Sequence, residues 1–81
     1  MLHIKDLQLI SILTKSQSLS AAARALNVTP PALSTRLKRL EAQLKVNLAV
    51  RSARHLSLTP EGEQLALSAA EILTKIEDLS E

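Results

Sequence analysis

The side chains best suited to chemistry lie on one face of a predicted helix over residues 29–44. Leu33, Leu37 and Leu40 recur at steps of four and three residues, so they form the buried side of that helix. The opposite face carries short hydroxyl and cationic side chains, namely Ser34, Thr35, Lys38 and Arg39, with Arg36 at its margin. Groups of this kind hydrogen-bond to base edges and form ion pairs with phosphates. The chemistry they indicate is nucleic-acid binding.

The residues around this helix predict a helix-turn-helix over Ser20 to Glu41. Ser20 can cap a first helix, and the three alanines that follow it allow another helix to approach closely. Asn27 tolerates the left-handed conformation that ends a helix. Thr29 can then cap the second helix, whose first turn accommodates two prolines. We predict that this second helix ends near Leu44 and enters the major groove of DNA.

Charge is distributed unevenly along the chain. Between residues 24 and 54, seven basic residues stand against a single acid, Glu41. After Thr59, six acidic residues stand against Lys75 alone. A basic centre beside an acidic tail fits a nucleic-acid face backed by a solvated helix.

The composition limits what else the chain can do. Its 81 residues suffice for one small domain, and 46% are hydrophobic but none is aromatic. Such a core is thin, so we expect a partner chain to help stabilise it. The chain has no cysteine, no apolar run that could span a bilayer and no signal-peptide layout at its start. We therefore expect a soluble, cytoplasmic protein.

Neither catalysis nor metal binding is indicated. His3 and His55 lie far apart in the sequence and lack the cysteines or spaced acids of a metal site. We find no nucleophile with a base, no glycine-rich phosphate loop and no paired carboxylates in an apolar setting. We predict a protein that is not an enzyme and that holds neither a metal nor a cofactor.

Other elements must hold the polar helix in place. A broad apolar stripe predicts a first helix over Lys5 to Lys15, followed by a turn over residues 16–19. Residues 45–58 alternate in polarity on either side of a polar break, which favours a short β-hairpin over an irregular loop. A hairpin directly after a helix-turn-helix is a wing. Its tip would carry Arg54, with Arg51 at its base.

The last segment predicts a long helix with two apolar faces. Thr59, Pro60 and Glu61 form a strong helix start, and the helix should run to about Leu79, about 30 Å at 1.5 Å per residue. One face forms a heptad seam that we assign to a dimer interface, consisting of Leu65, Ala69, Ile72, Ile76 and Leu79. The other face would pack on the first helix through Leu58, Ala66, Ala70 and Leu73.

These elements predict an all-α, mainly helical winged helix-turn-helix. It would have a three-helix core, a short β-hairpin wing and a long C-terminal helix. We divide the chain into a DNA-binding domain over residues 1–58 and a linker and dimerisation helix over residues 59–81.

The chain resembles the amino-terminal DNA-binding domain of LysR-type transcriptional regulators. The matching stretches are SLSAAARALNVTPPALSTRLKRLEAQL and NLAVRSARHLSLTPEGEQL, and the resemblance covers essentially all 81 residues. It implies a homodimer that binds an interrupted inverted repeat in double-stranded DNA, with a tetramer allowed in a full-length bacterial regulator. It also implies a larger effector-binding domain, which this chain does not encode, so that any small-molecule effector would bind elsewhere.

The resemblance also assigns roles to single residues. The base-reading residues would be Pro30, Pro31, Ser34 and Thr35. Arg54 on the wing would enter the minor groove. Candidates for phosphate contacts would be Ser18, Ser20, Arg36 and Arg51. Thr29, which caps the recognition helix, and Lys38 complete the DNA-binding set that we predict.

Several positions depart from the family pattern. Pro30 and Thr35 stand where Gln and Arg are common, so base specificity should differ from the commoner members. Because Pro31 disfavours helical backbone at Pro30, we expect the recognition helix to begin one residue late. Lys45 stands where Gly is common, and Ala49 where Phe is common, which removes about 2 kcal/mol of burial.

Two other interpretations remain open at this stage. A small helical domain with a heptad helix could be a protein-interaction module that dimerises through that helix. A different winged-helix family would have the same chemistry with another dimer geometry. The basic segment favours DNA, since a protein-binding surface would more typically expose leucine, methionine or aromatic anchors.

Overall fold

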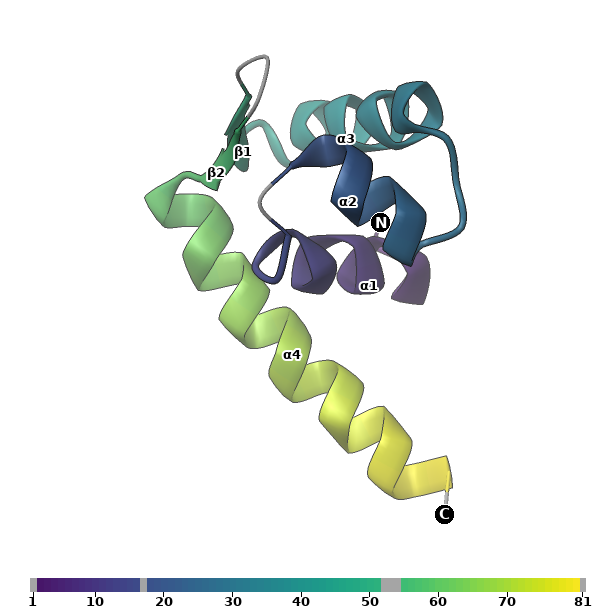
Figure 1. Ribbon diagram of the computed structural model, residues 1–81. Coiled ribbons are helices and arrows are strands. Elements are labelled where there is room, and N and C mark those ends of the chain that lie inside the picture. The colour runs from purple at the N-terminus through teal and green to yellow at the C-terminus, as the bar shows by residue number, and fades with distance from the viewer. Residues whose placement is uncertain (1, 17, 52–54, 81) are drawn as a thin grey trace.

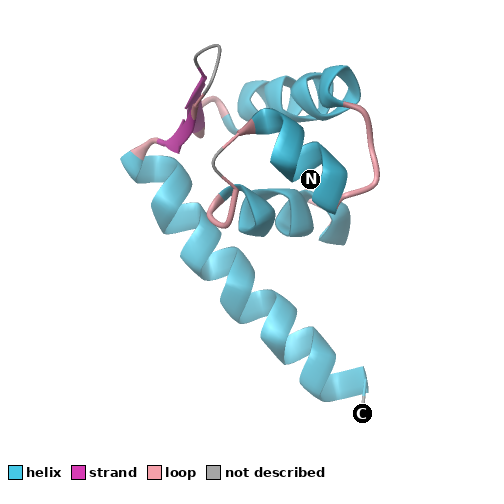
Figure 2. Cartoon of the chain, viewed as in Figure 1, coloured by secondary structure: helices cyan, strands magenta, loops and turns pink. Residues whose placement is uncertain are grey.

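The computed structural model describes residues 2–16, 18–51 and 55–80, and it confirms the mainly helical winged fold. The elements follow in the order α1 (Ile4–Leu13), α2 (Leu19–Ala25), α3 (Pro30–Leu44), β1 (Ala49–Arg51), β2 (Leu56–Leu58) and α4 (Pro60–Ser80). In Figure 1 the first three helices form one group, the hairpin stands beside α3, and α4 extends away past α1. Figure 2 shows that, among the described residues, strands occur only in the hairpin.

The core is aliphatic throughout the described residues. Its largest fully buried side chains come from α1, α3 and the segment before the wing: Leu9, Ile10, Leu33, Leu37, Leu40 and Leu48. Ala22 and Ala23 of α2 are also buried, and their small side chains let α2 lie close to its neighbours. No polar or charged side chain of the described part is buried, so the core is held by apolar packing.

The start of α2 differs from the sequence prediction. Ser18, not Ser20, is the N-cap, and its side-chain oxygen accepts a hydrogen bond from the Ala21 N–H at 3.1 Å. The reason lies in the apolar residues Leu19, Ala22, Ala23 and Leu26, which recur at helical spacing. A helix that begins at Leu19 turns all four toward the core. Ser20 is left exposed in the first turn.

The turn between α2 and α3 follows the predicted chemistry. Asn27 adopts a left-handed conformation with φ of 58°. Thr29 caps α3, since its side-chain oxygen accepts from the Ala32 N–H at 3.2 Å. Our expectation of a late start is wrong, because α3 already begins at Pro30. Both prolines fit the first turn, where backbone N–H groups have no intrahelical partner.

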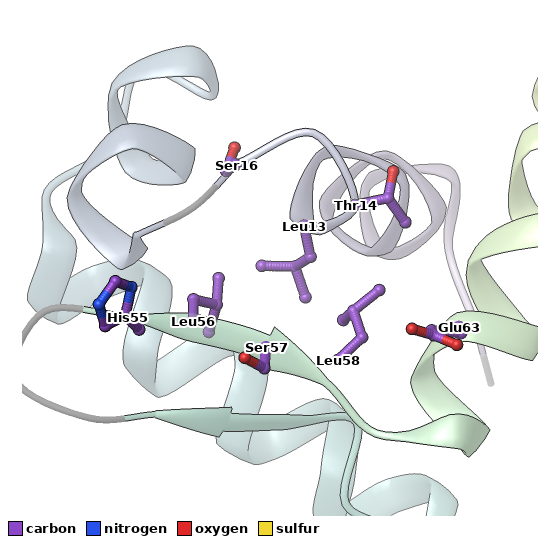
Figure 3. Close-up of a pocket in the computed structure, with 8 residues that line it drawn as sticks. All are labelled: Leu13, Thr14, Ser16, His55, Leu56, Ser57, Leu58 and Glu63. Atoms are coloured by element: carbon purple, nitrogen blue, oxygen red, sulfur yellow. The ribbon is translucent and has the colours of Figure 1, made fainter.

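The predicted hairpin is confirmed as a two-stranded antiparallel sheet that pairs Ala49 with Leu58 and Arg51 with Leu56. The alternation in the sequence predicts that Leu48 and Val50 face the same side of the hairpin. In the structure Leu48 is buried, whereas Val50 is 63% exposed. Leu48 precedes the strand. Figure 3 shows Leu13 of α1 pointing toward Leu56 and Leu58 of β2, so the wing is attached to the core through aliphatic contacts.

The long helix α4 has 21 residues and ends at Ser80, one residue beyond the predicted end near Leu79, and it packs on α1 through its N-terminal half. Its packed stripe consists of Gly62, Ala66 and Ala69, all buried, and the half-buried Leu73. Steps of four, three and four residues keep these positions on one face. The small size of Gly62, Ala66 and Ala69 allows α4 to approach the core closely.

Candidate nucleic-acid interface

The recognition helix α3 exposes a polar face opposite its leucines. Leu33, Leu37 and Leu40 are buried, whereas Pro31, Thr35 and Lys38 are exposed on the other side. The hydroxyl of Thr35 donates to the Pro31 carbonyl oxygen at 3.1 Å, so its outward-facing oxygen retains acceptor lone pairs. This face is free to enter a groove and offers both hydrogen-bonding groups and positive charge.

A polar cluster joins α3 to the wing. The Arg51 guanidinium at the end of β1 donates from Nη1 to the Ser34 hydroxyl at 2.5 Å. Its Nη2 lies 3.7 Å from Oε1 of Glu41, an ion pair whose side chains are only 23% and 13% exposed. Oε2 of Glu41 accepts from the Leu48 N–H at 2.7 Å and from the Ala49 N–H at 3.4 Å. The structure thus brings together Ser34 and Arg51, two predicted site residues.

Arg36 lies apart from the other predicted contacts. Its Nη2 donates to the Lys5 carbonyl oxygen at 3.4 Å, and the side chain is half-buried. It also lines a pocket with His3, Asp6 and Arg39, between the start of α1 and the C-terminal part of α3. In this structure Arg36 therefore ties α3 to α1, and its charge lies at the margin of the polar face.

Three predicted phosphate-binding hydroxyls lie at the starts of α2 and α3, two of them as helix caps and one on the exposed surface. Ser18 and Thr29 are caps whose oxygens accept backbone N–H groups. Ser20 is exposed and lies at the start of α2. Helix starts of this kind present free N–H groups that suit phosphate oxygens. The assignment of these residues to phosphates stays a prediction.

The wing is only partly described. The predicted minor-groove residue, Arg54, lies outside the described residues. Just beyond it, His55 is exposed and leads into β2. The exposed Val50 and the half-buried Arg51 mark the opposite strand of the wing.

The open face of α4 carries most of the predicted dimer seam. Ile72 is 45% exposed and Leu79 is 85% exposed, while Leu65 and Ile76 are half-buried. Ala69 does not belong to this face: it is fully buried against the core of its own chain, and Ala70, which we assigned to the packed face, is exposed. The packed stripe follows residues 62, 66, 69 and 73, so Ala66 and Leu73 lie on the face that we predicted and only Ala69 and Ala70 exchange faces.

A pocket lies beside the wing, between α1 and β2. It has a volume of about 560 Å³ and is lined by aliphatic and hydroxyl side chains together with His55 and Glu63. Figure 3 shows Leu13 of α1 beside Leu56 and Leu58 of β2 among the residues that line this pocket. Across the described residues, no group of three histidine, cysteine or acidic side chains could hold a metal ion. Among the described helices, none is both long and apolar enough to cross a membrane.

Fold and site together define a winged helix-turn-helix protein with an exposed recognition helix. Residues 4–63 match the model of the bacterial regulatory helix-turn-helix proteins of the lysR family. The chain therefore belongs to this family, which comprises transcriptional regulators and is not an enzyme class.

Curated relatives match three quarters or more of this chain. The HTH-type transcriptional regulator YbhD of Escherichia coli is 36% identical over 76 residues, which are 94% of this chain and 24% of YbhD. The AhcY transcriptional activator HvrB of Rhodobacter capsulatus is 45% identical over 62 residues, which are 76% of this chain and 21% of HvrB. The chain thus spans about a quarter of the length of these curated relatives.

Solved structures show the same fold. The DNA-binding domain (DBD) of BenM in complex with catB site 1 DNA is 26% identical to this chain, with a TM-score of 0.89. The match covers 98% of this chain and 85% of the BenM chain. The CbnR DBD–DNA complex is 28% identical with a TM-score of 0.89, over 98% and 91%. Vibrio fischeri DarR in complex with DNA is 32% identical with a TM-score of 0.86, over 96% and 27%.

Sequence reasoning missed one residue of this site. Glu41 accepts two backbone N–H groups before and within the wing and pairs with Arg51. Its signal was visible, since it is the single acid within a strongly basic segment. A single acidic residue within a basic segment is a candidate for an ion pair with one of the neighbouring cations in the folded chain.

Proposed function

We propose that this chain binds double-stranded DNA sequence-specifically, as the DNA-binding part of a transcriptional regulator. The observation that carries the proposal is the exposed polar face of α3, with Pro31, Thr35 and Lys38, opposite a buried leucine stripe. This face belongs to a fold that matches two DNA-bound domains over 98% of the chain. Family membership supports the same conclusion.

In the proposed complex α3 lies in the major groove. Bases would be contacted by Pro30, Pro31, Ser34 and Thr35. Phosphate contacts would come from Ser18, Ser20, Thr29, Arg36 and Lys38. Arg51, which the family resemblance also assigns to a phosphate, is left out of this set because its guanidinium contacts Ser34 and Glu41. Arg54 would enter the adjacent minor groove, where a narrow A/T-rich segment concentrates negative potential. Phosphate contacts would give salt-dependent affinity, and base contacts would give discrimination.

We further propose a homodimer that pairs along the open face of α4. Leu65, Ile72, Ile76 and Leu79 would form the contact, which would bury the apolar surface that the single chain exposes. Two recognition helices about 34 Å apart, or a multiple of that distance, would match an interrupted inverted repeat. The protein would act in the cytoplasm, where bacterial DNA lies, and a tetramer and effector response would need a longer protein. The chain itself would need no cofactor.

The proposal can be tested with two matched charge deletions. Lys38→Ala removes a cation from the exposed face of α3, and Lys75→Ala removes an exposed cation from α4. Affinity for a random-sequence duplex is measured across a salt series by fluorescence anisotropy. The slope of log K against log salt should fall in magnitude by about 0.9 for Lys38→Ala and stay unchanged for Lys75→Ala. A shallow slope in the wild type, or equal losses in both variants, would contradict the proposed interface.

A further inference from the structure

The cluster of Ser34, Arg51 and Glu41 restricts what the Ser34 hydroxyl can offer to DNA. A serine hydroxyl has one proton to donate and two lone pairs that accept. The Arg51 guanidinium has only donors, so the 2.5 Å contact from its Nη1 must occupy a lone pair of Ser34 Oγ. The hydroxyl proton then points away from the guanidinium. What Ser34 retains most readily for a ligand is therefore its donor.

The guanidinium is itself held in place by Glu41. One carboxylate oxygen of Glu41 lies 3.7 Å from Arg51 Nη2, and the other accepts the Leu48 N–H at 2.7 Å. Because the side chains of this pair are 23% and 13% exposed, solvent screens the attraction only partly. Glu41 thus fixes Arg51, and Arg51 fixes the hydroxyl of Ser34.

We propose that Glu41 and Arg51 are positioning residues that make Ser34 a hydrogen-bond donor toward a base acceptor in the major groove. The acceptors available there are purine N7, guanine O6 and thymine O4, whereas the amino groups of cytosine and adenine are donors. Ser34 therefore selects for an acceptor at one position of the half-site. The inference rests on the proposed function, because it needs α3 in the major groove.

Thr35 supplies an internal contrast. Its hydroxyl donates to the Pro31 carbonyl oxygen at 3.1 Å, so its outward-facing oxygen accepts. The two neighbouring hydroxyls of α3 thus differ in polarity, and the difference is set by their partners in the protein. Thr35→Val is a matched control, since it removes a hydroxyl from the same helix without touching the Arg51 cluster.

The test begins with duplexes selected from random DNA by the wild type. Base preferences are then compared for the wild type, Ser34→Ala, Glu41→Gln and Thr35→Val. Ser34→Ala should relax the preference at one half-site position by about three- to tenfold, the usual effect of one hydrogen bond. Glu41→Gln should relax the same position, because the neutral amide still accepts backbone N–H groups but no longer attracts Arg51. Thr35→Val should leave that position unchanged.

Base analogues then establish the polarity. A 7-deazapurine deletes the N7 acceptor, 4-thiothymine weakens the O4 acceptor, and 2-aminopurine deletes the adenine donor from the major groove. At the position set by Ser34, deleting or weakening the acceptor should cost the wild type about three- to tenfold and cost Ser34→Ala nothing. If deleting the donor weakens wild-type binding instead, the assigned polarity is reversed and the proposal is wrong.

The salt series separates positioning from phosphate binding by Arg51. Arg51→Met, checked for folding by circular dichroism, should relax the Ser34 position while the salt slope stays unchanged. A slope smaller by about 0.9 with base preference intact would instead make Arg51 a phosphate contact and overturn its positioning role. If the wild type enriches no sequence at all, the proposed function fails and this inference falls with it. If sequences are enriched but Glu41→Gln changes no base preference, only the inference fails.

Discussion

Replacing Gly62 with alanine sets two physical effects against each other. Alanine is favoured over glycine by about 1 kcal/mol in a helix interior, which is an upper limit for Gly62 in the first turn of α4. A Cβ on residue 62, however, would lie 2.0 Å from the Leu48 carbonyl oxygen and 2.9 Å from its carbon. The backbones of α4 and of the segment before the wing would have to separate by about 1 Å or more to relieve this contact.

The separation has a definable cost. The Leu48 carbonyl oxygen accepts the Thr59 N–H at 2.9 Å, and the Thr59 hydroxyl donates to the Asn47 carbonyl oxygen at 2.6 Å. Weakening one such bond costs about 1 kcal/mol, and overpacking costs about 1–3 kcal/mol more. After the gain in helix propensity, Gly62→Ala should destabilise the fold by about 1–3 kcal/mol.

Thermal unfolding followed by circular dichroism measures this balance. At about 4–8 °C per kcal/mol for a domain of this size, Gly62→Ala should lower Tm by roughly 4–24 °C. Ser68→Ala, at an exposed position of the same helix, should change Tm by far less. All proteins are compared at one concentration, because Tm of a dimer depends on it. A Tm equal to or above that of the wild type would refute the claim that close backbone approach requires glycine here.

Three further predictions concern the end of α3, the dimer contact and the wing. Lys45 follows the last turn of α3 with φ of 58°, a conformation that glycine adopts without strain. Lys45→Gly should therefore stabilise the fold by about 0.5–1 kcal/mol and raise Tm. Asn27 has the same φ but tolerates it better than lysine, so Asn27→Gly should change Tm less. Ile72→Asp should convert a dimer to a monomer in analytical ultracentrifugation, whereas Leu67→Asp, which is exposed on another face of α4, should leave the dimer intact. An unchanged mass for Ile72→Asp would show that the dimer does not form through the open face of α4. Arg54→Ala should weaken binding and reduce preference for A/T-rich flanks, and unchanged flank preference in a competition assay would remove Arg54 from the minor groove.

The main elements could be predicted from the sequence because local signals were strong. Thr29 was correctly predicted as the cap of α3, although we expected the helix to begin one residue later than it does, and Asn27 was correctly predicted as the turn residue before it. The apolar spacing of α3 indicated its buried side correctly. In these segments cap chemistry and periodicity agree with the packing that the tertiary structure requires.

The errors arise where two local solutions were nearly equivalent. Ser18 and Ser20 can both cap a helix, and only the burial of Leu19 decides between them. Ala69 and Ala70 are both small, so the sequence could not tell which one faces α1. Ala69 is the buried one because it lies on the same stripe of α4 as Gly62, which packs closely against Leu48. That contact joins segments distant in the sequence, so helical periodicity alone did not reveal it.

The candidate site was predicted as a list of residues, without the contacts among them. Ser34 and Arg51 are 17 positions apart, so no helical period links them. Their contact depends on how the wing folds back on α3, which Glu41 controls through backbone N–H groups. Long-range hydrogen bonds of this kind leave no periodic signal in a single sequence.

Selection from random duplex DNA, followed by affinities across a salt series, tests the central claim most directly. The account predicts an enriched inverted repeat with half-sites about one turn, about 34 Å, or a multiple apart, bound tightly and with steep salt dependence. If no sequence is enriched and binding is weak at physiological salt, the exposed face of α3 does not read DNA. The interpretation as a protein-interaction module that dimerises through α4 would then take its place.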